Sequence, residues 1–122
     1  MAELRSAAPE GAGVYFLEPA DGATLTNPVR VVFGLKGMGV APAGYDVKNT
    51  GHHHLLVNDP EVDYSVSLPV TEQIRHFGGG QTETSVELPP GTHRLKLLLG
   101  NHLHIPHDPP VESATITVTV TE

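Results

Sequence analysis

The stretch Gly51-His52-His53-His54-Leu55-Leu56-Val57 places three consecutive histidines directly before an apolar segment. Asp59-Pro60 follows it, so the stretch has the length and the boundary of a β-strand. Side chains on a strand alternate between its two faces, which places His52 and His54 together on one face. His53 shares the other face with apolar side chains of the same stretch, and we expect it to be a buried core residue.

Alternating apolar and polar residues predict further strands on both sides of this stretch. The clearest covers residues 114–120, where Ile and Val alternate with Thr. The 13 Gly and 11 Pro of the chain separate these segments as turns. We expect about seven short strands, at residues 14–17, 29–36, 51–58, 82–88, 93–99 and 114–120, with residues 62–70 as a short strand or an extended edge. At most one helical turn is expected, at residues 71–76.

This pattern predicts an all-β protein, an immunoglobulin-like β-sandwich of about seven strands. A cupin-like jelly roll is the alternative, although the usual cupin pattern of a His-x-His pair followed by Glu is met only loosely. The 122 residues fit one domain, which we place at residues 14–122. Residues 1–13 are rich in Ala, Gly, Glu and Ser, and we expect them to form a flexible N-terminal arm.

The overall composition argues against several classes of function. Its net charge is −7 and its seven basic residues are scattered, so we expect no nucleic-acid partner. No apolar run reaches the length needed to span a bilayer, so no membrane insertion is expected. Cysteine is absent, which excludes disulfides and thiolate ligands. Residues 1–10 contain no apolar signal-peptide core, and no feature predicts an oligomeric state.

A second group of histidines, 102, 104 and 107, follows about fifty residues after the first, and His76 lies between the two groups. Each group contains a His-x-His pair, which on a strand places two imidazoles side by side with Cα atoms about 7 Å apart. Such a pair suits two ligands of one tetrahedral or square-planar ion. The third and sixth strands of an immunoglobulin-like sandwich are neighbours, so the two groups are expected to meet. If the strand ends at Gly100-Asn101, alternation no longer predicts to which face of the sheet His102 and His104 point.

The chain is therefore expected to bind copper(II) or zinc, because both ions accept an all-nitrogen ligand set. The predicted metal ligands are His52, His54, His76, His102, His104 and His107. Gln81, Glu83 and Asp108 are predicted to orient ligating imidazoles through hydrogen bonds. His107 has an alternative interpretation as a loop brace that acts through Asp108, and His93 is expected to be a structural corner residue. Binding is expected to fail as the pH falls through the usual histidine range, near ~6–7.

Four blocks of the sequence resemble an uncharacterised bacterial family, a domain of unknown function in small exported proteins. The blocks are Phe33–Gly44, Asn49–Leu56, His76–Glu83 and Leu97–His107. The resemblance covers roughly residues 14–120 and implies a periplasmic or secreted location. It implies no established activity. The histidine-bearing motifs of the family correspond here to His52, His53, His54, His76, His102, His104 and His107.

Three functional hypotheses follow from these residues. The first is an exported protein that binds a transition-metal ion through imidazoles. The second is a metal-dependent oxidoreductase or hydrolase at the same site, with Glu83 or a spare histidine as acid or base; its catalytic residues are otherwise unknown. The third is a metal-free binding module in which the histidines stack on a ligand or brace loops.

Overall fold

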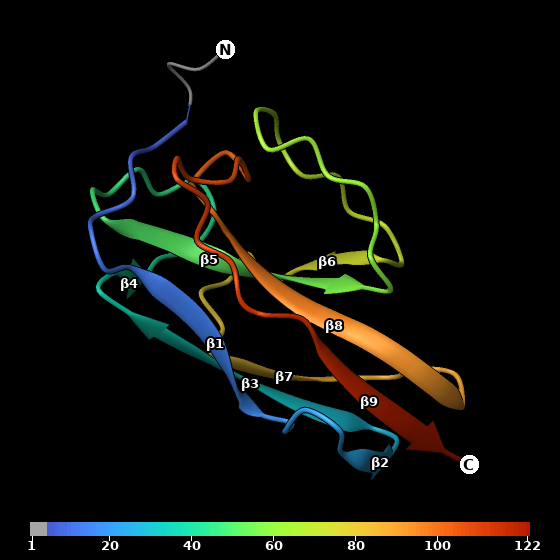
Figure 1. Cartoon of the computed structure of the whole chain (residues 1–122). Helices are drawn as coiled ribbons and strands as arrows, with labels where there is room; N and C mark the ends of the chain where they lie inside the picture. Colours follow the sequence, from blue (N-terminus) through green and yellow to red (C-terminus); the bar gives the residue numbers. More distant parts are fainter. Residues whose placement is uncertain (1–4) are drawn as a thin grey trace.

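The computed structural model describes residues 5–122, which form two β-sheets in a sandwich-like arrangement (Figure 1). The smaller sheet has the order β1-β3-β7, with β1 at Gly13–Glu18, β3 at Val29–Lys36 and β7 at Glu83–Val86. The larger sheet has the order β2-β9-β8-β5-β4, and β6 also pairs with β5. Its strands are β2 Thr24–Thr26, β4 Gly39–Val40, β5 Thr50–Val57, β6 Ile74–His76, β8 Gly91–Gly100 and β9 Ile116–Thr121.

The all-β prediction is confirmed, and the immunoglobulin-like and jelly-roll alternatives both stay predictions. The strands expected from alternation correspond to β1, β3, β5, β7, β8 and β9, whereas β2, β4 and β6 are too short to leave a period-two pattern. Residues 71–76 contain β6 rather than a helical turn, and residues 62–70 contain no strand. Within the described part of the chain, no helix is long and apolar enough to cross a membrane.

The main core lies between the two sheets and follows the alternation of their strands. Leu95, Leu97 and Leu99 of β8 are fully buried in it, as their period-two spacing predicted. His53 of β5 points to the same side, where it is 1% exposed and its ring centroid lies 4.5 Å from that of Phe33. The prediction that His53 is a core residue is therefore confirmed.

On the larger sheet, the side chains that do not point into the main core point to the outer face. β5 pairs antiparallel with β8, so His52 lies opposite Gly100 and His54 opposite Leu98. The predicted adjacency of these two segments is confirmed. β6 pairs with the other side of β5 and places His76 opposite His54. Histidines from two neighbouring strands therefore share one region of the outer face.

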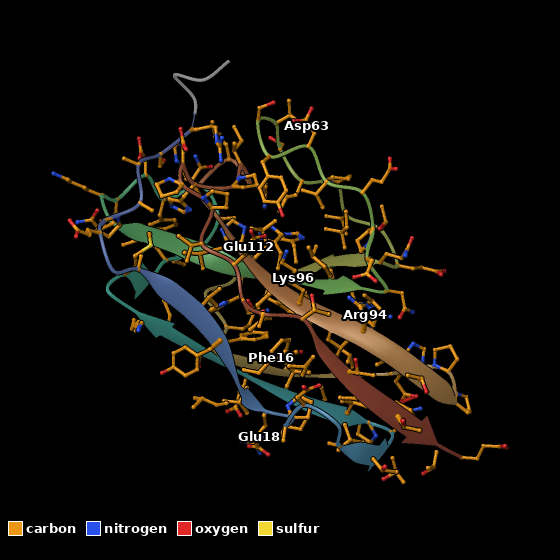
Figure 2. All side chains as sticks on the ribbon, viewed as in Figure 1. Phe16, Glu18, Asp63, Arg94, Lys96 and Glu112 are labelled. Carbon is orange, nitrogen blue, oxygen red and sulfur yellow. The ribbon has the colours of Figure 1, made fainter. Side chains whose placement is uncertain are left out.

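A second, smaller apolar cluster continues this outer face beyond the histidines. It consists of Leu56, Leu68, Ile74 and Leu98, and the segment 58–70 brings Leu68 over the sheet. Farther along β8, the Lys96 ammonium lies 2.8 Å from the Glu112 carboxylate (Figure 2). Along the outer face, the imidazoles are therefore followed by apolar side chains and then by an ion pair. The apolar side chains lie between the histidines and the ion pair and shield one side of the histidines from water.

The described part of the N-terminal segment runs beside the loop that follows β8 (Figure 1). The Asp108 amide donates to the Ser6 carbonyl, and the Ala8 amide donates to the Asp108 carbonyl. The Arg5 guanidinium donates to the carbonyls of Pro106 and His107. Residues 1–4 lie outside the described residues, and the flexibility of residues 1–13 stays a prediction. What the contacts establish is that residues 5–8 and the loop 106–108 are packed together.

Candidate metal centre

His52 and His54 form the base of the candidate site on the outer face of β5. Both side chains are fully buried, and their ring centroids lie 4.7 Å apart. The facing strand makes room for His54 at Gly100. A Cβ atom at Gly100 would lie only 2.6 Å from Cε1 of His54, closer than side-chain carbons pack. The absence of a side chain at this position therefore allows the His54 imidazole to lie against β8.

His104 approaches the pair from the turn after β8. Nδ1 of His104 lies 2.9 Å from Nε2 of His52, so one of the two neutral rings donates a hydrogen bond to the other. One ligand nitrogen each from His52, His54 and His104 lie within 4.8 Å of one another, an arrangement that could hold a metal ion. Zinc–imidazole bonds of about 2.0–2.1 Å place ligand nitrogens about 3.3 Å apart, so the rings need only small shifts to close on an ion.

His76 adds a fourth imidazole to this group. Its ring centroid lies 4.7 Å from that of His104, 5.8 Å from that of His54 and 5.9 Å from that of His52. The position follows from the pairing of β6 with β5, which aligns His76 with His54. We call His52, His54, His76 and His104 the imidazole cluster.

The hydrogen bonding of the imidazole cluster is incomplete. Nδ1 of His52 is buried and has no hydrogen-bond partner among the described residues. The buried His54 ring makes no hydrogen bond of normal geometry there and interacts only with the backbone of Leu98. A buried polar atom without a partner costs about 1–3 kcal/mol. A bound metal ion would replace the missing partner, because each unpartnered nitrogen that carries no proton offers a lone pair. The donor set therefore fits an ion that accepts nitrogen ligands.

The protonation state of the cluster also suits ligation. Burial, supported by the neighbouring imidazoles, lowers the pKa of His52 to about 4 and that of His54 to about 2. Burial and His76 lower the pKa of His104. Only neutral imidazole binds metal, and these rings stay neutral at neutral pH. Protons therefore compete with a metal at His52 and His54 only below the pH range of about 6–7 that the sequence alone suggested.

The other two predicted ligands point elsewhere. Nδ1 of His102 lies 3.5 Å from a carboxylate oxygen of Asp46, at the rim of the same turn. His107 is 1% exposed, and its Nε2 donates to the carbonyl of Thr50. The His107 ring also interacts with the backbone of Leu99, and burial lowers the pKa of this imidazole. Neither ring belongs to the group of three nitrogens, and their roles as ligands stay predictions.

The predicted supporting residues make contacts of their own. The Gln81 side-chain oxygen accepts a hydrogen bond from the Gly79 amide, and Glu83 pairs with Arg30 at 2.7 Å. The backbone of Asp108 bonds to the N-terminal segment. The proposed support of imidazoles by Gln81, Glu83 and Asp108 stays a prediction.

His93, in contrast, has the structural role expected of it. Its Nε2 donates to the carbonyl of Pro89, and its Nδ1 accepts from the side-chain amide of Asn58. Both ring nitrogens are thereby satisfied, which separates this residue from the imidazole cluster.

Replacing His53 by Leu is expected to leave metal affinity unchanged and to raise the free energy of unfolding by about 1 kcal/mol. The substitution removes Nδ1 of His53, a buried atom without a partner in the described chain, and keeps an apolar side chain in contact with the core. A metal titration measures the affinity, and urea unfolding at neutral pH measures the free energy of unfolding. A loss of affinity comparable to that of a His54 variant would contradict the separation of the two faces of β5.

Comparison with known proteins identifies a family to which the chain is similar. The model of the family described as Domain of unknown function (DUF4399) matches residues 31–121. Neither the curated proteins nor the solved structures contain a match to the chain.

Proposed function

The chain belongs to this family of unknown function, and we propose that it is an exported protein that binds one transition-metal ion through His52, His54 and His104. His76 supplies a fourth imidazole at the same place. The observation that carries the proposal is the convergence of three ligand nitrogens within 4.8 Å, together with a buried Nδ1 of His52 that has no hydrogen-bond partner in the described chain. The export part of the proposal rests on the resemblance of the sequence blocks alone.

Copper or zinc fits this ligand set best. Imidazole nitrogen suits both ions, and the general affinity order of divalent metals favours copper(II) over zinc. The bound ion supplies a Lewis-acidic centre. The chain itself supplies neutral ligands, because burial keeps the pKa of His52 and His54 low. The apolar cluster beside His54 limits the access of water from one side.

Titration with copper(II) and zinc is expected to give one tight site per chain. His54→Ala and His104→Ala each remove one of the three converging nitrogens, so each is expected to weaken affinity by about 100-fold or more. His102→Ala is the matched control, since it removes an imidazole from the same turn that points toward Asp46 instead. The metal affinity of His102→Ala is expected to stay within about twofold of the wild-type affinity.

The protein for this test is prepared without a polyhistidine tag, and elemental analysis records any metal retained on purification. Equal affinities in wild type, His54→Ala and His104→Ala would refute the proposed ligands. Absence of a tight site in the wild-type chain for either metal would refute metal binding altogether and favour a metal-free binding module.

A further inference from the structure

The turn that presents His104 is built around one side chain. β8 ends at Gly100, and the chain then reverses so that the Asn101 amide donates to the carbonyl of Ile105. The His104 amide in turn donates to the carbonyl of Asn101. These two bonds close residues 101–105 into a compact loop directly above the imidazole cluster.

The Asn101 carboxamide holds the same loop from the inside. Its Oδ1 accepts hydrogen bonds from the amides of Leu103 at 2.9 Å and Ile105 at 3.1 Å. Asn101 is only 1% exposed, so water cannot easily replace these bonds if the side chain is removed. The amides on both sides of His104 in the sequence are therefore fixed by one oxygen atom.

This restraint bears directly on the position of the imidazole. His104 has a φ of 64°, a left-handed conformation that residues other than glycine rarely adopt. Bonds on both sides of the residue must hold such a conformation, and in this turn Asn101 provides them. The result is the approach of His104 Nδ1 to within 2.9 Å of His52 Nε2.

The other end of the carboxamide reaches the N-terminal segment. Nδ2 of Asn101 donates to Oγ of Ser6 at 3.1 Å, next to the bonds from Arg5 to the loop carbonyls. One side chain thus connects three parts of the molecule: the end of β8, the turn that carries His104, and residues 5–8.

We propose that Asn101 is a positioning residue of the metal centre, which sets the place of His104 and couples it to the N-terminal segment. The proposal rests on the proposed function, because it names the residue that prepares one ligand of that site. Asn101 is not one of the proposed ligands; it acts on His104 through the backbone of the turn. Residues that orient a ligand in this way typically change metal affinity by about 10- to 100-fold when they are replaced.

The test compares Asn101→Ala, Asn101→Asp and Ser6→Ala with wild type. Asn101→Ala removes both amide bonds of the turn, and we expect copper(II) affinity to fall about 10- to 100-fold with a changed visible absorption spectrum of the bound ion. Asn101→Asp keeps an oxygen at Oδ1 and is expected to recover most of the affinity. Ser6→Ala removes only the acceptor in the N-terminal segment, and we expect a fall of less than about tenfold with a faster release of copper.

The matched control is Asn27→Ala. The Asn27 side chain also bridges main-chain groups, with bonds of 2.8 and 3.0 Å to the carbonyl and the amide of Leu88. It follows β2, at the end of the sandwich away from the 101–108 loop (Figure 1). The Asn27→Ala substitution should lower the free energy of unfolding and leave the copper affinity and the visible spectrum of the bound copper unchanged. An equal loss of affinity in Asn27→Ala and Asn101→Ala would reduce Asn101 to a general structural role and overturn the proposal.

A metal-free measurement separates this proposal from the proposed function. Nitrogen-15 NMR of the imidazoles reports the hydrogen bond between His52 and His104, which Asn101→Ala should abolish and Asn101→Asp should retain. If wild type binds no metal, the proposed function fails, and this signal alone judges whether Asn101 positions His104. If Asn101→Ala keeps both the signal and wild-type copper affinity, the inference is wrong whether or not the chain binds metal. Should Asn101→Ala not fold, Ser6→Ala and Asn101→Asp carry the same comparison.

Discussion

Lowering the pH from about 7.5 to about 5.5 is expected to reduce the free energy of unfolding of the metal-free protein by at least about 4 kcal/mol. In the folded chain, burial above all holds the pKa of His52 and His53 at about 4 and that of His54 at about 2. In the unfolded chain each returns to its ordinary value of 6.5. Below that value the unfolded state binds protons that the folded state excludes.

The sign and the size follow from this difference in proton binding. Stability is complete above about pH 6.5 and falls as the pH decreases, by about 1.4 kcal/mol per pH unit for each of the three imidazoles. The loss continues until the folded pKa of each group is reached. The pKa of Glu112 is lowered from its ordinary 4.5, so this carboxylate contributes its own loss only at lower pH, outside the interval tested.

Urea unfolding with a chelator present, at several pH values, measures the effect. His53→Leu removes one of these three imidazoles and should reduce the dependence on pH by at most about a third, because His104 and His107 also have a lowered pKa. A wild-type protein with the same free energy of unfolding at both ends of the interval would show that these imidazoles are protonated, or accessible to water, in the folded state.

Gly100→Ala is expected to lower metal affinity by about 100-fold or more and stability by about 1–3 kcal/mol. The added Cβ would lie 2.6 Å from Cε1 and 3.2 Å from Nδ1 of His54. His54 is fully buried and has the rings of His52 and His76 beside it, so it cannot move away without displacing other members of the cluster. The substitution therefore disturbs the site through volume alone.

Gly39→Ala is the matched control for this substitution. Gly39 lies on β4, the strand next to β5, and a Cβ there would lie 3.7 Å from the Thr50 side chain, an ordinary contact. Its metal affinity is expected to equal that of wild type. Copper titration and urea unfolding of both variants measure the two effects. A Gly100→Ala protein with unchanged affinity would place the bound ion away from His54.

The two-residue period of a strand predicts the position of some histidines of the site and not of others. Alternation along one strand separated His53 from its two neighbours. The structure places His53 in the main core and buries His52 and His54 on the other face of the sheet. Strand alternation could not place His102 and His104, because β8 ends at Gly100 and residues beyond it no longer alternate between the two faces of the sheet. Asn101 was not recognised as a functional residue, since a polar residue after a glycine is ordinary turn chemistry in a sequence.

The sequence shows that residue 76 is a histidine, but it does not show that this histidine lies beside His54. β6 covers only Ile74–His76, and a strand this short leaves no readable pattern. Its pairing with β5 joins residues about twenty apart in the chain, through backbone hydrogen bonds that any side chain permits. For this reason a cluster of four rings could be expected from composition but could not be assembled from spacing.

The sequence by itself determined the all-β class, the inward leucines of β8 and the division of the three consecutive histidines, because each follows from the two-residue period of a single strand. Only the tertiary structure decided which imidazoles converge. His104 reaches the cluster because a left-handed turn held by Asn101 redirects the chain, whereas His102 on the same turn lies beside Asp46. A ligand set depends on contacts between residues distant in the chain, and strand alternation carries no information about such contacts once the strand has ended.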